Sequence, residues 1–120
     1  MTTPNETELR TLLENAAKAC GYKYDAESGT IINAKLNVQE WQPHLPGLDS
    51  QVLAAELGIN SFWIEESTAV NCFSSQLDEG FYEDVADHPS KAHAQAMAVL
   101  RVAAAIGEAM PEEQAPASPA

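Results

Sequence analysis

Basic side chains are scarce in this sequence. Its 120 residues include 18 acidic and 6 basic side chains, which gives a formal net charge of −12. No Lys or Arg lies between Leu36 and Ser90, whereas ten Asp and Glu residues do. Such a surface repels phosphate, which disfavours direct binding to nucleic acid or to an anionic membrane, and it attracts cations and basic protein surfaces. The same charge also keeps a protein soluble without any partner.

Long hydrophobic runs and a leader sequence are also missing. No apolar run is longer than that of residues 102–106, which is far below the roughly 20 residues that a membrane span needs. The first ten residues have neither the cationic start nor the apolar run of a signal peptide, so we expect a cytoplasmic protein. The two cysteines, Cys20 and Cys72, fit no zinc-binding spacing. We expect reduced packing residues, with a disulfide or a reactive thiol as the alternative.

Catalytic motifs are absent as well. The sequence has no Gly-x-Ser-x-Gly element, no glycine-rich phosphate loop and no cysteine with an obvious histidine partner. His88 and His93 are five residues apart, so on one helix they would point to different faces, and His44 lies in a proline-rich segment. The sequence therefore predicts no enzyme, no cofactor, no catalytic residue and no metal ligand.

Three segments have the pattern of helices. Apolar residues at three- and four-residue steps predict a helix that ends before Gly21, and Asn5 and Glu8 have capping-box spacing at its start. A short second helix is predicted from Asp49, as its N-cap, to Gly58, with Val52 on the buried side. The third and longest helix is predicted to begin at Pro89 and to carry a stripe of small residues. That stripe comprises Ala92, Ala96, Val99, Ala103, Ile106 and Met110.

The remaining segments alternate and turn as strands do. Residues 22–38 predict a hairpin, and residues 61–75 predict two strands around a Glu65-Glu66-Ser67 turn. Residues 39–47 contain two prolines and are expected to be irregular, with Trp41 as a lid at the edge of the core. The fold class is therefore α+β: three helices on a small, mostly antiparallel sheet, sandwich-like, in the order α-β-β-α-β-β-(β)-α. One domain is expected over residues 1–110, with a disordered Pro/Ala-rich tail over 111–120.

Four blocks of the sequence carry a resemblance to a known family. They read LLENAAKACGYKY, WQPHL, DSQVLAAELGI and AHAQAMAVLRVAAAIGEAM. The chain resembles the phage ABA sandwich domain family, which consists of small uncharacterised proteins of bacteriophages and prophages. Gln42 stands where that family has Asn in its Trp-Asn-Pro-Leu element, and Leu48 stands where it often has Gly. The resemblance implies helices packed with a sheet, a phage origin and a bacterial host cell, but no established activity.

The candidate site is the acidic segment from Asp78 to Asp87, which includes two adjacent aromatic residues. Phe81 and Val85 either dip into the core or form a short strand. Aromatic side chains supply much of the binding energy at protein interfaces, and carboxylates steer basic partners toward them. The predicted partner-binding residues are Asp78, Glu79, Phe81, Tyr82, Glu83 and Asp84. Alternatives for the same segment are a solvated loop, a loose cation site, a mimic of nucleic acid and a core position for Phe81.

The functional hypothesis is an acidic phage accessory protein that acts by non-covalent binding to a host or phage protein with a basic surface. A host defence factor or a nucleic-acid-handling factor is the expected target. The first alternative is a nucleotide- or ion-binding protein or an enzyme of unknown class. The second alternative is a homodimer or virion accessory protein that associates through the Ala-rich final helix.

Overall fold

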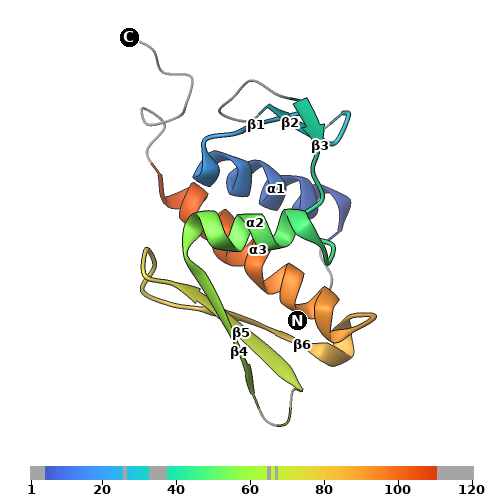
Figure 1. Cartoon of the computed structure of the whole chain (residues 1–120), viewed down its shortest axis with the longest axis vertical. Coiled ribbons are helices and arrows are strands. Elements are labelled where there is room, and N and C mark those ends of the chain that lie inside the picture. The colour runs from blue at the N-terminus through green and yellow to red at the C-terminus, as the bar shows by residue number, and fades with distance from the viewer. Residues whose placement is uncertain (1–4, 26, 33–37, 65, 67, 111–120) are drawn as a thin grey trace.

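The fold is α+β, with three helices and two antiparallel sheets of three strands each (Figure 1). The computed structural model describes residues 5–25, 27–32, 38–64, 66 and 68–110, so the tail expected over 111–120 lies outside the described residues. In chain order the elements are α1 (Glu6–Cys20), β1 (Lys23–Asp25), β2 (Thr30–Ile32), β3 (Val38–Glu40), α2 (Leu48–Leu57), β4 (Ile59–Ile64), β5 (Ala69–Ser74), β6 (Phe81–Asp84), the 3-10 helix η1 (Val85–Asp87) and α3 (Lys91–Ala109).

The helices form a layer between the two sheets (Figure 1). The sheet β1-β2-β3 lies over α1, and the sheet β4-β5-β6 lies against α3. The predicted fold class is thereby confirmed, and the strands are divided between two sheets where the sequence predicted one. None of the helices in the described part of the chain is long and apolar enough to cross a bilayer.

Helix α1 forms as its sequence predicts. The Asn5 side chain accepts a hydrogen bond from the Glu8 N–H at 2.8 Å, and the Glu8 carboxylate accepts one from the Asn5 N–H at 3.2 Å. These two bonds satisfy N–H groups that have no partner within the helix. Gly21 ends the helix with φ 77°, a left-handed conformation that glycine adopts without steric cost.

Helix α3 is the centre of the molecule, because α1, α2 and all three strands of the second sheet pack against it. Its small side chains let α1 approach closely, as the position of Gly107 shows. A Cβ atom added at Gly107 would lie 1.8 Å from the backbone oxygen of Asn15. The expected small-residue stripe is buried at Ala96, Val99, Ala103 and Ile106, whereas Ala92 is exposed and Met110 is partly exposed. These four residues of the stripe therefore pack inside the molecule.

Trp41 attaches the first sheet to the helices. Its side chain is 3% exposed, and its ring makes edge and tilted contacts with Tyr22 and Tyr24 at centroid distances of 6.0 Å. The backbone N–H of Trp41 donates to the backbone carbonyl of Gly29 at 3.1 Å. These three aromatic rings thus hold β1 and the end of β3 over α1.

Four details of the expected elements are wrong. Residues 38–40 form β3, because Pro43 and Pro46 follow the strand and do not interrupt it. Gly47 is the N-cap of α2, and the Asp49 carboxylate accepts from the Gln42 N–H at 2.9 Å instead of capping the helix. Val52 is exposed. Pro89 precedes α3, whose N-cap is Ser90, because the Ser90 hydroxyl accepts from the His93 N–H at 3.2 Å.

Both cysteines are free thiols in partly or fully buried positions. Burial, reinforced by the Glu56 carboxylate, raises the pKa of the Cys20 thiol to about 12. Burial likewise raises the pKa of Cys72, although a hydrogen bond with Ser61 acts in the opposite direction. Because the thiolate is the reactive form, both side chains act as apolar packing groups near neutral pH.

Candidate functional site

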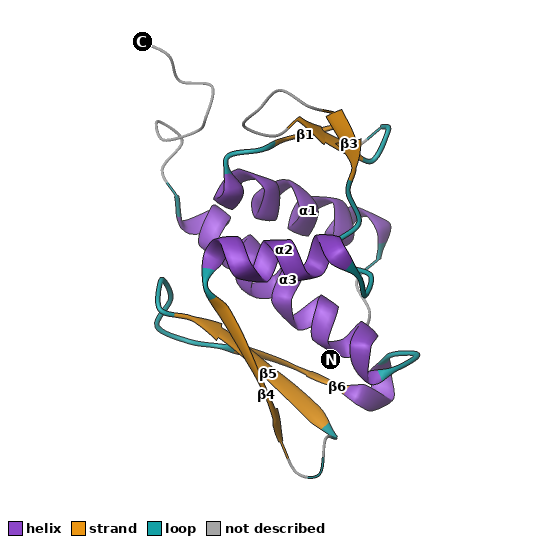
Figure 2. Ribbon diagram, in the orientation of Figure 1, coloured by secondary structure: helices purple, strands orange, loops and turns teal. Residues whose placement is uncertain are grey.

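Part of the acidic segment is a strand. Residues 81–84 form β6, which pairs antiparallel with β5. Successive side chains of a strand point to opposite faces, so Tyr82 and Asp84 lie on one face of the sheet and Phe81 and Glu83 lie on the other. The inner face packs against α3, whereas the outer face points away from the helices (Figure 2).

The six sequence-predicted residues are thereby separated into two groups. Asp78 and Glu79 are exposed in the connection between β5 and β6, and Tyr82 is 54% exposed on β6. Asp84 is half-buried on the same face as Tyr82. Phe81 is half-buried and packs against the hydrophobic core, which is the core alternative that the sequence left open.

Glu83 does not lie on the partner-accessible surface, so the expectation of an exposed carboxylate at this position is wrong. Its side chain is 0% exposed and accepts two hydrogen bonds. Its Oε1 lies 2.8 Å from Nε2 of His88, and its Oε2 accepts from Nε of Arg101 at 2.6 Å. Burial of the carboxylate is tolerated because charged and polar partners replace the lost water.

The Glu83–His88–Arg101 cluster joins three elements. Glu83 comes from β6, His88 follows η1, and Arg101 projects from the middle of α3. The His88 and Arg101 side chains are only 5% and 17% exposed. The Glu83 carboxylate and the His88 imidazole are closed to solvent and have no access to a substrate. Because the cluster joins three elements, it fixes β6 and η1 on α3.

The outer face of the second sheet presents three exposed aromatic side chains, Phe62, Phe73 and Tyr82, which we call the aromatic face. Phe62 and Tyr82 are both opposite Asn71 in the strand register, so Phe62, Asn71 and Tyr82 lie in one row across the sheet. Phe73 is two residues further along β5, and its ring lies 5.8 Å from the ring of Phe62 in an edge-on arrangement. Phe62 is 50% exposed and Phe73 is 38% exposed. No described element covers this face.

The sequence reading missed Phe62 and Phe73 as site residues. Phe62 alternates with Trp63, and Phe73 alternates with Cys72, but the sequence alone did not show which face of each strand is exposed. Their proximity to Tyr82 depends on the register of β4, β5 and β6, which no local pattern specifies. That register brings together aromatic residues that are up to 20 positions apart.

The charge around the aromatic face has one sign. Residues 59–84, which contain all three strands, include six Asp and Glu residues and no Lys or Arg. One of the six, Glu83, is paired inside the protein, and three others, Asp78, Glu79 and Asp84, lie around the aromatic face or on it. Exposed aromatic rings beside unpaired carboxylates suit a partner that offers both apolar contact and positive charge.

A metal site has no basis in the described residues, since no group of three or more His, Cys, Asp or Glu side chains is arranged to hold an ion. Comparisons with protein-family models, with curated proteins and with solved structures found no match to this chain. The resemblance to the phage ABA sandwich domain family therefore stays a prediction.

Proposed function

We propose that this protein acts by non-covalent binding, through the aromatic face, to another protein whose surface is basic. The observation that carries the proposal is the exposure of Phe62, Phe73 and Tyr82 on one face of a sheet that contains no basic residue. Large exposed apolar patches on soluble proteins mark interaction sites, and aromatic side chains dominate the energetics of such sites.

Charge supports a partner of this kind. The net charge of −12 gives a second copy of the same chain an equal negative charge, and the two copies would repel each other. A basic protein is attracted instead, and its Arg or Lys side chains can lie over the rings of Phe62 and Tyr82 as well as beside Asp84. In the phage setting that the resemblance implies, the proposed partner is a host defence factor or a nucleic-acid-handling factor.

Replacing both Phe62 and Tyr82 by Thr tests the proposal. Both side chains are half exposed, and Thr suits a strand, so we expect the free energy of unfolding to fall by less than about 1.5 kcal/mol. We expect the amount of partner captured from a bacterial lysate to fall at least tenfold, since the double variant loses both aromatic contacts. Quantitative mass spectrometry of the captured proteins provides the measurement.

A matched control is available at Leu48, which is 73% exposed at the start of α2 and does not belong to the second sheet. Leu48→Thr removes exposed apolar surface elsewhere and should leave capture unchanged. Replacing Asp78, Glu79 and Asp84 by their amides should reduce capture mainly at low salt, because salt screens exposed charges. Equal capture by the wild type and the Phe62/Tyr82 variant would contradict the proposal.

A further inference from the structure

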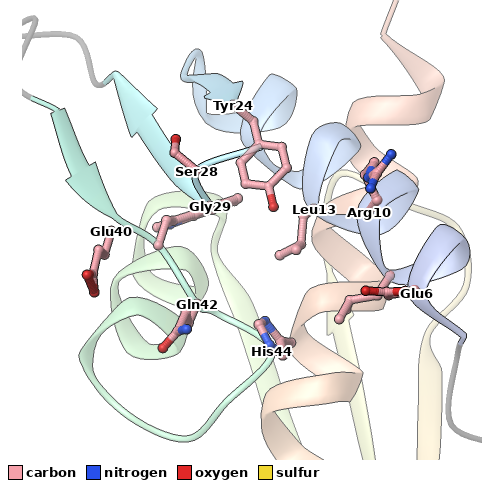
Figure 3. Close-up of a pocket in the computed structure, with 11 residues that line it drawn as sticks. Glu6, Arg10, Leu13, Tyr24, Ser28, Gly29, Glu40, Gln42 and His44 are labelled. Atoms are coloured by element: carbon pink, nitrogen blue, oxygen red, sulfur yellow. The ribbon is translucent and has the colours of Figure 1, made fainter. Parts of the chain in front are cut away.

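A cleft on the other side of the helix layer is lined by polar groups from three separate segments (Figure 3). Its volume is about 350 Å³, and it is bounded by the N-terminal half of α1, the first sheet and the loop that follows β3. This volume is at the small end of the range of about 300–1,000 Å³ typical of ligand pockets. The cleft is separate from the aromatic face.

Within the described residues, six polar side chains of the cleft make no hydrogen bond or ion pair. They are Glu6, Arg10, Tyr24, Glu40, Gln42 and His44. Glu6 and Arg10 are four residues apart on α1, a spacing that commonly produces a salt bridge, yet they are not within pairing distance of each other. Both charges are therefore free to interact with a bound molecule.

His44 has an unsatisfied nitrogen atom beside the cleft. Its Nδ1 atom is buried and has no hydrogen-bond partner, which is rare in proteins because an unsatisfied buried polar atom destabilises the fold. Burial lowers the pKa of His44 below its usual range, so the ring is neutral near pH 7. Figure 3 shows the Tyr24 hydroxyl directed into the same space, toward Leu13, with Glu6 extending into that space from α1.

The cleft also has an apolar wall. Leu9 and Leu13 come from α1, and Trp41 follows β3. A ligand of this cleft thus meets the Glu6 carboxylate and the Arg10 guanidinium one helical turn apart, uncharged polar groups and an apolar wall. The second carboxylate of the lining, that of Glu40, points away from the cleft in Figure 3. An inorganic anion would use only Arg10 and would be repelled by Glu6, and a simple amine would use only Glu6 and would be repelled by Arg10.

We propose that this cleft binds a small zwitterion with an apolar body, namely a free α-amino acid with an apolar side chain. Its ammonium group would pair with Glu6 and its carboxylate with Arg10, since the two groups on one carbon atom are close enough to match residues one helical turn apart. Its side chain would lie against Leu13 and Trp41. The N-terminus of a peptide fits less well, because it has the ammonium group without the adjacent carboxylate.

Three leucine-based probes separate the contributions of the two charges. Leucine carries both charges, N-acetylleucine carries only the carboxylate, and leucinamide carries only the ammonium group. At a concentration about ten times its Kd, we expect leucine to raise Tm by at least about 3 °C, because it binds the native state alone. The two single-charge analogues should raise Tm by less than about 1 °C at the same concentration.

Substitutions identify the site. We expect Glu6→Gln and Arg10→Gln each to weaken leucine binding at least tenfold in isothermal titration, while the exposed position of both side chains preserves the fold. Glu108→Gln and Lys23→Gln, which change exposed charges outside the cleft, should leave affinity unchanged. Failure of leucine, valine and phenylalanine to bind, or equal binding of the single-charge analogues, would overturn the proposal. Either result would leave the proposed function of the aromatic face untouched.

Discussion

Replacing Arg101 by Met is expected to destabilise the fold by about 3–5 kcal/mol, because it leaves the buried Glu83 carboxylate without its positive partner. Arg101 donates to Glu83 at 2.6 Å, and Glu83 is 0% exposed, so water cannot easily take the place of the lost guanidinium. A loss of this size is a large fraction of the roughly 5–15 kcal/mol that stabilises a typical domain. Urea unfolding monitored by circular dichroism gives the change in the free energy of unfolding.

Two further variants make the Arg101 prediction specific. Lys91→Met removes an exposed cation from the same helix and should change stability by less than about 0.5 kcal/mol. The double variant Arg101→Met with Glu83→Gln should recover part of the loss, since an uncharged amide costs less to bury than an unpaired carboxylate. A single-variant loss below about 1 kcal/mol would show that the cluster does not hold β6 on α3.

Gly107→Ala is expected to destabilise the protein by about 2–3 kcal/mol, although the same change usually stabilises a helix. The added Cβ would lie 1.8 Å from the Asn15 oxygen and 2.7 Å from the Asn15 carbonyl carbon. Both are backbone atoms, so the overlap can be relieved only if α1 moves away from α3. That movement would loosen the largest helix–helix contact in the molecule.

The sign of the effect decides the Gly107 prediction. In a helix with free space, Gly→Ala would raise stability by up to about 1 kcal/mol through helix propensity alone. Glu108→Ala, at the exposed neighbouring position, is the matched control and should change stability by less than about 0.5 kcal/mol. A Gly107→Ala variant with a Tm equal to or above that of the wild type would contradict the close packing of α1 on α3.

Local patterns in the sequence predicted most of the helices and strands. The Asn5–Glu8 capping box and Gly21 define α1 because their hydrogen bonds involve residues close together in the chain. The alternation within residues 61–75 predicted β4 and β5 for the same reason. Strand β3 was missed because it has three residues and precedes a proline-rich loop, so its pairing with β2 has no local signal.

The candidate site could be predicted only in part, because its residues meet through non-local contacts. Tyr82 was identified from its acidic and aromatic neighbourhood, and the structure places it on an exposed face. Glu83 has the same neighbourhood in the sequence, but it is buried and pairs with Arg101, which is 18 residues away. The cleft at His44 was not predicted, since it combines side chains from α1, β1 and the loop after β3 that share no sequence motif.

Site-specific photo-crosslinking in living bacteria tests the central claim most directly. A p-benzoylphenylalanine residue at position 62 places a reactive ketone on the aromatic face, and the same residue at position 48 serves as the control on another exposed surface. We predict that position 62 forms a crosslink to a protein of basic isoelectric point and that position 48 does not. No crosslink from position 62, or the same products from both positions, would contradict a binding role for the aromatic face.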